Sequence, residues 1–246
     1  MSIDINNKIA VVTGANRGIG LAISQTFLNQ GAKKVYLAVR NTESVKALEN
    51  QYGDRVQAIH VDVSDKTSIQ NLVKQTADAE IVVNNAGVLK KADSYDSNAE
   101  EALQFEFNIN TLGLLRMAQA YEPVLADKPQ AAFVQLNSVA SLKNFAPFTT
   151  YSASKAASYS LTQGLKDSWA AKGIQVLSVH PGPIDTDMAD EAGFEQADSP
   201  QVVAEGIVKS LASGQFHLFP DSMAKEFESA YQSFAVNVVE PLPQQP

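Results

Sequence analysis

The sequence predicts an α/β fold in which helices cover both faces of a parallel sheet of about seven strands. Short apolar runs alternate with segments of helical periodicity along most of the 246 residues. Runs such as IAVVT and EIVVN show little alternation of polar and apolar residues, which is typical of strands buried on both faces. No internal repeat and no low-complexity linker divides the chain, so we expect a single doubly wound domain.

Six apolar runs are predicted as strands, at about Ile9–Thr13, Val35–Val39, Val56–Val61, Ile81–Asn84, Phe133–Asn137 and Ile174–Val179. Most of them are separated by segments long enough for a crossover helix, which indicates repeated βα units. The prolines of the tail at 240–246, EPLPQQP, cannot continue a helix, and we expect this tail to be extended.

The composition excludes several classes of protein. With 45% hydrophobic residues the chain can bury a substantial core, and the absence of cysteine excludes disulfides, thiolate metal sites and cysteine nucleophiles. A net charge of −8 leaves no basic footprint for phosphates and disfavours nucleic acid as a partner. The start MSIDINNKIAVVTG has no secretory pattern, and no run approaches the roughly 18 apolar residues of a membrane span. We expect a cytoplasmic protein without membrane partners.

The segment TGANRGIG lies between the first predicted strand and a run of helical periodicity. Glycines allow the backbone to turn tightly and approach a pyrophosphate, which the free N–H groups and positive dipole of a helix start attract. Glycines also serve turns for steric reasons alone, but the position between strand and helix favours nucleotide binding. The candidate cofactor residues of this loop are Gly14, Asn16, Arg17, Gly18, Ile19 and Gly20.

The glycine spacing is G-x-x-x-G-x-G, which differs from the common G-x-G-x-x-G dinucleotide fingerprint. TGxxxGxG after the first strand resembles the short-chain dehydrogenase/reductase superfamily, in its compact branch. The resemblance implies one NAD(P)-binding Rossmann domain over residues 1–246 and an oxidoreductase activity. It also implies a homo-oligomer, a dimer or tetramer, joined through long helices at about Glu100–Ala126 and Ser152–Ala171.

The end of the second predicted strand bears on the choice of cofactor. An NAD site usually has an acidic residue about twenty residues beyond the glycines, where it binds the ribose 2′-hydroxyl. Here the strand ends LAVRN, so Arg40 and Asn41 occupy this place and no carboxylate is present. Arg40 and Arg17 would instead bind a 2′-phosphate through charged hydrogen bonds. They could also be ordinary surface arginines, but the pattern favours NADP(H).

Two further segments match the family near the cofactor. Asp62 and Val63 follow the third strand, where the resemblance implies a contact with the adenine amino group. Asp62 would serve equally as a helix cap, and the two roles are compatible. The run NNAG ends the fourth strand, and its first residue, Asn84, is predicted to support the sheet. The residues expected to line the cofactor cleft are Asn85, Ala86 and Gly87.

The run TYSASK contains a tyrosine and a lysine four residues apart, Tyr151 and Lys155. On a helix both side chains project from nearly the same face, although this spacing also occurs on ordinary helix surfaces. The resemblance adds a serine thirteen residues before the tyrosine, at Ser138, with Ser141 as a nearby competitor. It also adds Asn110, in the run NTLG of the preceding long helix. Because all four positions carry the family's residue, Asn110, Ser138, Tyr151 and Lys155 are predicted to be catalytic.

Carbonyl reduction explains these residue types. The reaction needs a hydride at carbon and a proton at oxygen, and a free phenol, with a pKa of about 10, is a slow proton relay at neutral pH. We expect Lys155 to lower the pKa of Tyr151 and to hold the nicotinamide ribose, so that both residues also bind cofactor. Ser138 would hydrogen-bond the substrate oxygen, and Asn110, by resemblance, would hold a water between Lys155 and solvent.

The segment after the sixth strand, HPGPIDT, resembles the family's PG motif. The resemblance implies contacts with the nicotinamide carboxamide, and the residues assigned to this region are Pro181, Gly182, Ile184 and Thr186. The following residues 187–199, DMADEAGFEQADS, are acidic and interrupted by glycine, and we expect a mobile lid over the substrate. An acidic surface loop is the alternative.

Neither hydrolytic nor metal chemistry is favoured. His60, His180 and His217 are scattered along the chain, and none stands with a serine and a carboxylate in a hydrolase pattern. The acidic residues at 185–191 have no histidine partner and fit no calcium-loop template. We interpret them as solvated charges and expect no metal.

The leading hypothesis is an NADP(H)-dependent reductase of small ketones or aldehydes, acting reversibly as an alcohol dehydrogenase. Phe145, Phe148, Met188 and Phe194 lie in segments that could border an apolar substrate, although loop packing explains them equally. A nucleotide-binding sensor would commonly lack the tyrosine or the lysine, and a sugar epimerase of the related larger fold would show TGxxGxxG. Reduction of carrier-bound 3-ketoacyl groups usually calls for a basic docking surface, which the acidity of the chain disfavours.

Overall fold

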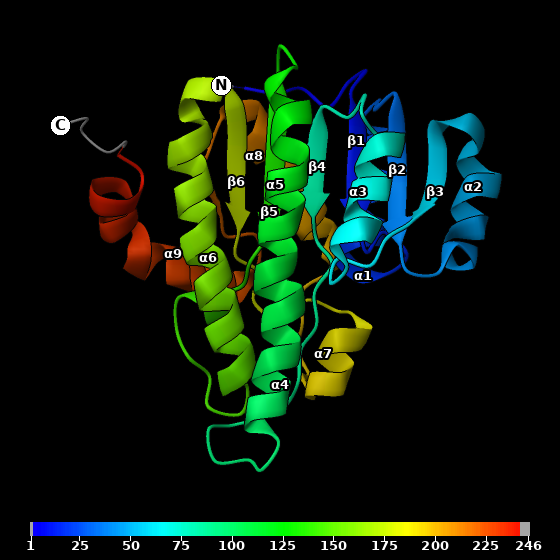
Figure 1. Cartoon of the computed structure of the whole chain (residues 1–246). Coiled ribbons are helices and arrows are strands. Elements are labelled where there is room, and N and C mark those ends of the chain that lie inside the picture. The colour runs from blue at the N-terminus through cyan, green and yellow to red at the C-terminus, as the bar shows by residue number, and fades with distance from the viewer. Residues whose placement is uncertain (1, 242–246) are drawn as a thin grey trace.

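The structure is a computed structural model that describes residues 2–241. Within these residues the fold is built on a parallel sheet of seven strands in the order β3-β2-β1-β4-β5-β6-β7 (Figure 1). Helices cover both faces of the sheet, which confirms the predicted doubly wound α/β fold. The strands are β1 (Ile9–Thr13), β2 (Lys34–Val39), β3 (Val56–His60), β4 (Ile81–Asn84), β5 (Ala131–Leu136), β6 (Ile174–Val179) and β7 (His217–Leu218).

Six of these strands lie where apolar runs predicted them, with ends that differ by at most two residues. β5 begins at Ala131, two residues before the predicted Phe133, because Ala131 already pairs with Ile174. β7 consists of His217 and Leu218, which pair with the end of β6. Two residues are too few to form a recognisable apolar run, so the position of this strand was not predicted.

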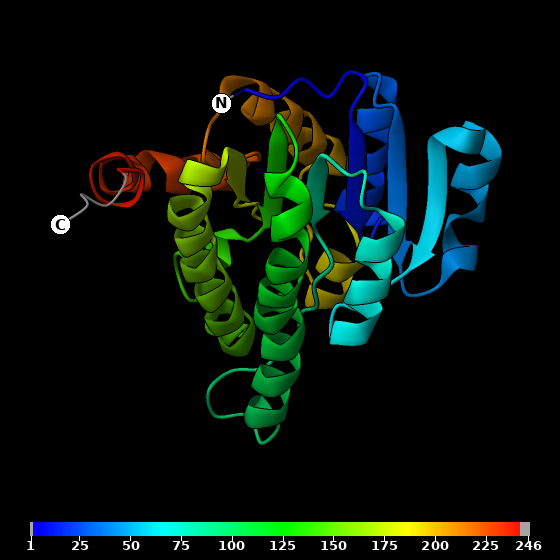
Figure 2. The same cartoon turned by 45° about the horizontal axis from the view of Figure 1, so that its top comes forward.

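The main helices are α1 (Gly18–Asn29), α2 (Lys46–Tyr52), α3 (Lys66–Gln75), α4 (Ala99–Glu106), α5 (Leu112–Ala126), α6 (Thr149–Trp169), α7 (Asp187–Ala192), α8 (Pro200–Ser213) and α9 (Ser222–Phe234). On one face of the sheet α1 and α8 pack together, and on the other face α3, α5 and α6 lie side by side (Figures 1 and 2). α9 lies at the β7 edge and carries the chain away from the sheet (Figure 2).

Two apolar cores, one on each face of the sheet, hold these layers together. Neighbouring residues of β1 point to opposite faces, so Val12 packs with α1 and α8 while Val11 packs with α3, α5 and α6. Both valines are fully buried. This burial on two sides explains why the strands show no regular polar alternation.

β1 and β4 are neighbours in the sheet although β2 and β3 come between them in the sequence. The connections that follow β1 and β4 therefore leave in opposite directions, which opens a crevice at the carboxyl ends of these two strands. TGANRGIG follows β1, and NNAG begins at the last residue of β4. The topology thus brings the two motifs to the same crevice, where open α/β sheets bind their ligands.

The long helix predicted at about Glu100–Ala126 is present as one helical run with an irregular turn. α4 leads into a π-helical turn, η3 (Phe107–Thr111), and η3 leads directly into α5. Such turns are frequent at functional sites, and this one contains Asn110. The second predicted long helix is α6, which begins at Thr149.

The residues predicted as a lid begin with regular structure. Thr186 caps the start of α7, the helix ends at Ala192, and the following Gly193 has a left-handed φ of 83°. The chain then returns toward the preceding segment, where Asp198 forms an isolated bridge with Ile184. The segment is therefore a short helix and a return loop.

The predicted extended tail at 240–246 lies mostly outside the described residues. α9 continues into a second π-helical turn, η6 (Ala235–Val239), and Glu240 and Pro241 follow it. The structure does not describe residues 242–246. Across residues 2–241, no helix has both the length and the apolar character needed to cross a membrane.

Candidate active site

A cavity of about 930 Å³ opens at the carboxyl ends of the central strands. Every predicted site residue lines it except Gly20 and Asn110. The predicted residues on its wall are Gly14, Asn16, Arg17, Gly18, Ile19, Arg40, Asn41, Asp62, Val63, Asn85, Ala86, Gly87, Ser138, Tyr151, Lys155, Pro181, Gly182, Ile184 and Thr186. Motifs that are far apart in the sequence therefore meet around one space.

Different steric reasons explain the three glycines of the first loop. Gly14 and Gly18 have φ values of 65° and 51°, a left-handed conformation that favours glycine. Gly20 has no such φ, but a Cβ at this position would lie 2.2 Å from the carbonyl oxygen of Gly14. The structure thus places Gly20 behind the loop, where it lets α1 pack against Gly14, and not on the cavity wall.

The same loop presents the beginning of a helix to the cavity. α1 starts at Gly18, and Arg17 at the N-cap position makes no side-chain capping hydrogen bond. The first N–H groups of α1 therefore receive no acceptor from the cap, and the positive end of the helix dipole lies beside them. Asn16 and Ile19 complete this part of the wall. These donors fit the diphosphate of a dinucleotide.

The loops after β2 and β3 form the part of the cavity predicted to hold adenosine. Arg40, Asn41 and Asp62 line it. Asp62 Oδ1 accepts hydrogen bonds from the Ser64 hydroxyl at 2.7 Å and the Ser64 N–H at 2.8 Å. These bonds, and to a smaller extent the charge of Arg40, lower the pKa of Asp62. Asp62 therefore braces a turn and also lines the cavity. The predicted helix-capping role is wrong, because Asp65 caps α3, and the contact with adenine stays a prediction.

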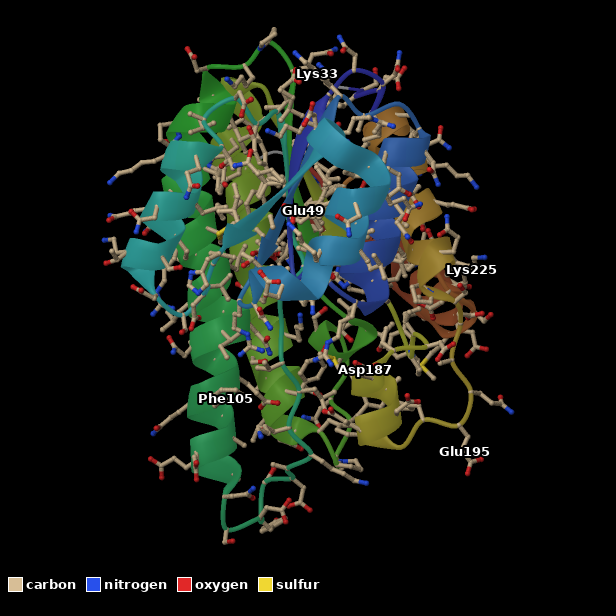
Figure 3. The ribbon with its side chains drawn as sticks, turned by 90° about the vertical axis from the view of Figure 1, so that its right-hand side faces the viewer. Lys33, Glu49, Phe105, Asp187, Glu195 and Lys225 are labelled. Atoms are coloured by element: carbon tan, nitrogen blue, oxygen red, sulfur yellow. The ribbon has the colours of Figure 1, made fainter. Side chains whose placement is uncertain are left out.

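Arg17 connects the glycine loop to the beginning of α7. Its Nη1 lies 2.5 Å from Oδ2 of Asp187, which Figure 3 marks at the start of that helix. Both side chains are largely exposed, at 63% and 61%, so the ion pair contributes little to stability. The Arg17 guanidinium can therefore exchange Asp187 for another anion in the cavity.

The NNAG segment is fixed by β1 and β5. Asn84 Nδ2 donates to Gln135 Oε1 at 2.7 Å inside the sheet. Asn85 Nδ2 donates to the carbonyl oxygen of Thr13 at 2.9 Å, and Thr13 Oγ1 accepts from the backbone N–H groups of Asn85 and Ala86. These bonds hold the segment as a rigid part of the wall between the glycine loop and β5.

Tyr151 and Lys155 project from α6 into the cavity. The Lys155 Nζ lies 5.7 Å from the centre of the Tyr151 ring. It donates a hydrogen bond of 2.8 Å to the carbonyl oxygen of Leu136, at the end of β5. Its remaining N–H groups can serve other acceptors. The lysine is thus anchored on the sheet, with its ammonium near the tyrosine ring.

Ser138 lies just beyond β5 on the same wall. Its hydroxyl donates to the carbonyl oxygen of Pro181 at 3.3 Å and caps the short 3₁₀ turn η4 (Val139–Ser141). Ser141, the competing serine, does not line the cavity, and its Oγ lies 3.0 Å from Nδ1 of His180. Of the two serines, Ser138 is therefore the one in position to meet a ligand.

Asn110 is buried and braces the site from behind. Its Nδ2 donates to the carbonyl oxygen of Val88 at 2.9 Å and to Ser154 Oγ at 3.0 Å, while its Oδ1 accepts from the Val88 N–H. Its Oδ1 and the Lys155 Nζ lie 3.2 and 3.6 Å from where a Cβ of Gly87 would stand. A side chain at Gly87 would therefore fit tightly against the Asn110 amide. The predicted water-holding role of Asn110 stays a prediction.

The segment after β6 closes the far end of the cavity. The Gly182 N–H donates to Asp221 Oδ2 at 2.8 Å, and a Cβ at Gly182 would lie 2.7 Å from the other oxygen of this carboxylate. Thr186 Oγ1 donates to the carbonyl oxygen of Ile184 at 3.0 Å. Pro181, Gly182, Ile184 and Thr186 line the cavity, and their contacts with the nicotinamide carboxamide stay predictions.

Comparison with known proteins decides the family. A family model described as short chain dehydrogenase matches residues 8–197, which is more than half of the chain. The chain belongs to the short-chain dehydrogenase family. It is therefore an oxidoreductase of that family, as the glycine spacing and the TYSASK run predicted.

Relatives of this dehydrogenase extend over most of its length. An uncharacterized oxidoreductase of Staphylococcus aureus is 34% identical over 216 residues, which cover 84% of this chain and 92% of the relative. A short chain dehydrogenase of Burkholderia cenocepacia, solved in complex with NADP, is 26% identical with a TM-score of 0.87, and the match covers 97% of this chain and 100% of that chain. A short-chain dehydrogenase/reductase of Burkholderia phymatum, solved in complex with NAD, is 20% identical with a TM-score of 0.83 over 98% of this chain and 100% of that chain. The last comparison shows the shared fold.

Burial governs the ionisation of the central pair in this dehydrogenase. Burial raises the pKa of Tyr151 to about 12, a hydrogen bond with Ser138 lowers it, and the charge of Glu106 raises it further. Burial also lowers the pKa of Lys155 to about 8, whereas Glu106 acts in the opposite direction. The expected lowering of the Tyr151 pKa is therefore wrong for this structure, because burial is the largest influence on the phenol and raises its pKa. The phenol keeps its proton at neutral pH.

Glu106 and His180 are buried ionisable residues of the dehydrogenase to which sequence reasoning gave no role. Glu106 is fully buried and accepts from the Lys90 N–H at 2.6 Å. His180 is also fully buried, with Nε2 at 2.7 Å from Ser178 Oγ and Nδ1 at 3.2 Å from the Ser138 carbonyl oxygen. The available signal for Glu106 was its position four residues before Asn110, one helical turn away.

The histidines are less scattered than predicted. The rings of His180 and His217 lie 5.7 Å apart, and His217 Nδ1 lies 2.9 Å from Glu240 Oε1. His217 Nε2 faces the Tyr159 hydroxyl at 2.7 Å, so its neighbours are a carboxylate and a phenol, which is not the pattern of a hydrolase triad. In the described part of this dehydrogenase, no three His, Cys, Asp or Glu side chains form a group that could hold a metal ion.

Proposed function

We propose that the protein transfers a hydride between NADP(H) and the carbonyl or alcohol carbon of a small apolar ketone or aldehyde. The observation that carries this proposal is that Tyr151, Lys155 and Ser138 line the same cavity as the glycine loop and the start of α1. The nicotinamide, when bound, supplies or accepts the hydride. The chain itself supplies the proton, the orientation of the reacting oxygen and the binding of the dinucleotide.

In the reducing direction Tyr151 is the proton donor. Its hydroxyl, protonated at neutral pH, gives its proton to the carbonyl oxygen as the carbonyl carbon becomes an alcohol carbon. Ser138 Oγ donates a hydrogen bond to the same oxygen and stabilises the charge that develops on it. The Lys155 ammonium stabilises the phenolate that remains, and its remaining N–H groups hold the ribose hydroxyls. In the oxidising direction the proton moves back to Tyr151.

The preference for NADP(H) rests on the charges at the adenosine end. β2 ends without a carboxylate, and Arg40 and Arg17 line this part of the cavity. Guanidinium groups bind phosphate oxygens through charged, often bidentate hydrogen bonds. The Burkholderia cenocepacia relative, which was solved with NADP, supports the same choice.

An apolar substrate is favoured by the wall beside Tyr151. The apolar side chains on this wall are Val88, Leu89, Val139, Phe145, Pro147, Phe148, Met188, Phe194 and Met223. Phe148 packs against Phe194 with ring centres 5.7 Å apart, which joins the start of α6 to the loop after α7. Such a wall would bind a hydrocarbon or aromatic group next to the reacting carbonyl.

A homo-oligomer is supported by exposed apolar side chains on the long helical run. Leu103, Phe105, Phe107 and Leu112 are each between 37% and 41% exposed, and they follow one another along α4, η3 and α5. Figure 3 marks Phe105 on α4. We propose that this run pairs with a second copy of the chain, which would cover these side chains.

A spectrophotometric screen tests the proposed function. Purified protein is mixed with NADPH or NADH and a panel of ketones, aldehydes and diketones, and cofactor oxidation is followed. We expect turnover of apolar ketones or aldehydes, with a higher kcat/KM for NADPH than for NADH. Binding of NADPH without its oxidation by any member of the panel would contradict a reductase and favour a nucleotide sensor.

A further inference from the structure

Glu106 is a fully buried carboxylate to which the mechanism above gives no role. It is the last residue of α4, directly before the π-helical turn η3. Its Oε1 accepts a hydrogen bond of 2.6 Å from the Lys90 N–H. Its Oε2 has no hydrogen-bond partner among the atoms that the structure describes. Burying a carboxylate oxygen without a partner is costly, so a compensating positive charge is expected near it.

Two parallel helical runs place Glu106 next to the catalytic face of α6. The run α4–η3–α5 lies alongside α6 (Figure 1). Asn110 Nδ2 donates to Ser154 Oγ at 3.0 Å, and Ser154 directly precedes Lys155. One helical turn earlier on both runs, Glu106 lies beside Thr150, although Thr150 Oγ1 forms no hydrogen bond of good geometry. The carboxylate therefore lies in the layer between the two runs, one turn before the contact of Asn110 with Ser154.

Lys155 follows Ser154 on α6 and is a buried cation. Only 5% of its surface is exposed, and its Nζ donates to a neutral acceptor, the carbonyl oxygen of Leu136. Burial alone lowers the pKa of Lys155, and the charge of Glu106 is the influence that opposes this within residues 2–241. Without a counter-charge, a buried ammonium of this kind loses its proton near neutral pH.

The charge interaction between Glu106 and Lys155 also affects the pKa of the carboxylate. Burial raises the pKa of Glu106, whereas Thr150, the Lys90 N–H and the charges of Lys90 and Lys155 lower it. The Tyr151 hydroxyl is the third titratable group that Glu106 influences. The groups facing Glu106 are therefore two cations and one phenol, and of the two cations only Lys155 is buried.

We propose that Glu106 is a positioning residue, the buried counter-charge that keeps the ammonium of Lys155 protonated beside Tyr151. This inference rests on the proposed function, in which Lys155 acts as a cation. Glu106 acts through Lys155 and does not line the cavity, so it touches neither substrate nor cofactor. Its hydrogen bond to the Lys90 N–H additionally fixes the loop that carries Val88 and Leu89 to the substrate wall.

The variant Glu106→Gln removes the charge and keeps an oxygen that can accept from the Lys90 N–H. The matched control is Glu101→Gln, the same change at an exposed position of α4. Proteins labelled with 13Cε-lysine are titrated by NMR, and the Lys155→Met variant identifies the Lys155 signal. We expect the titration midpoint of Lys155 to fall by about one pH unit or more in Glu106→Gln and to stay unchanged in Glu101→Gln. An unchanged midpoint in Glu106→Gln overturns the inference.

The pH profile of kcat provides the second readout. Loss of the Lys155 proton limits the rate at high pH, so the basic limb should move to lower pH in Glu106→Gln and return toward its original place in Glu106→Asp. A uniform loss of rate without displacement of this limb indicates a purely structural role. If the wild-type protein shows no Tyr151-dependent turnover, the proposed function fails, whereas the titration of Lys155 still decides the role of Glu106.

A reciprocal measurement covers the case in which Glu106→Gln does not fold, as judged by circular dichroism. In Lys155→Met the carboxylate is retained and its buried cation is removed. We then expect the 13Cδ titration midpoint of Glu106 to move to higher pH by about one unit, because the coupling acts equally on both partners. A midpoint equal to that of the wild-type protein overturns the inference.

Discussion

The Lys155 Nζ donates a hydrogen bond to the carbonyl oxygen of Leu136 and lies 5.7 Å from the centre of the Tyr151 ring. The lysine is thus fixed to the sheet with its ammonium near the phenol. The phenol itself is buried, and burial raises the pKa of Tyr151 to about 12. Tyr151 is therefore a protonated phenol at neutral pH, which is the form that carbonyl reduction requires.

Replacing Tyr151 by phenylalanine tests this role directly. The ring is retained and the hydroxyl is lost, so we expect NADPH affinity to stay close to wild type while kcat falls by about 10²- to 10⁴-fold. Steady-state kinetics and a fluorescence titration of NADPH measure the two quantities. Tyr95→Phe, at an exposed tyrosine, is the matched control and should change neither. A Tyr151→Phe variant with an unchanged rate would refute the assignment.

The sequence was most informative where one residue type satisfies both sterics and chemistry. Gly14 and Gly18 could be predicted because a left-handed φ and a close approach to phosphate both demand glycine. Tyr151 and Lys155 could be predicted because helical spacing places them on one face and because Ser138 and Asn110 also carry the residues of the family that the sequence resembles. The partner of Lys155, the Leu136 carbonyl oxygen, could not be predicted, since a backbone acceptor carries no sequence signature.

Arg40 should govern the preference between the two dinucleotides. It lines the adenosine end of the cavity, where β2 ends without a carboxylate and the nearby Asp62 is hydrogen-bonded to Ser64. We expect Arg40→Ala to raise the KM for NADPH by about ten- to a hundred-fold and to change the KM for NADH little, because charged hydrogen bonds are lost with NADPH alone. The measurement is steady-state kinetics with both cofactors.

Lys33→Ala removes a positive charge at the opposite end of the sheet and controls for the general effect of net charge (Figure 3). It should leave both KM values near those of the wild-type protein. Equal increases of the KM values for NADPH and NADH in Arg40→Ala would show that the arginine stabilises the cavity wall and does not bind the 2′-phosphate. Arg17 offers a second test of the same kind at the glycine loop.

Gly20 and Gly164 form a matched pair for the packing of the glycine loop. A Cβ at Gly20 would lie 2.2 Å from the Gly14 carbonyl oxygen, whereas a Cβ at Gly164 in α6 would meet nothing within 4 Å. We expect Gly20→Ala to lower the free energy of unfolding by about 1–3 kcal/mol and to weaken NADPH binding. Gly164→Ala should raise the free energy of unfolding by about 0.5–1 kcal/mol, because alanine is the better helix former.

Urea unfolding and an NADPH titration measure both glycine variants. Equal stabilities of Gly20→Ala and Gly164→Ala would show that the loop can move away from α1 at no cost. The pair thereby separates a steric requirement for glycine from the general effect of adding a methyl group to a helix.

The features that sequence reasoning missed share one physical cause: the environment of each side chain depends on which distant elements bury it. Glu106 belongs to the run QFEFN, which reads as an ordinary amphipathic helix surface until the packing of α4 on α6 encloses the carboxylate. His180 and His217 are far apart in the chain and meet only because β7 pairs with the end of β6. β7 itself is too short for a periodic pattern. Local patterns cannot report which polar group a distant element will cover.

His180 should make the stability of the protein depend on pH. Its ring is fully buried, with Nδ1 facing the Ser138 carbonyl oxygen and Nε2 facing the Ser178 hydroxyl. Burial lowers the pKa of His180 to about 3, so the folded protein does not take up the proton that the unfolded chain binds below pH about 6.5. Stability should therefore be complete above this pH and fall by about 1.4 kcal/mol per pH unit below it.

Replacing His180 by glutamine removes the titrating ring. We expect His180→Gln to be less stable at pH 7, because two buried hydrogen bonds are disturbed, yet to lose less stability than the wild-type protein between pH 6.5 and 5. Urea unfolding at several pH values measures both quantities. The control His60→Gln, at an exposed histidine, should follow the wild-type curve. Parallel curves for wild type and His180→Gln would show that the acid sensitivity arises elsewhere, and His217, whose pKa burial also lowers, would be the next residue to replace.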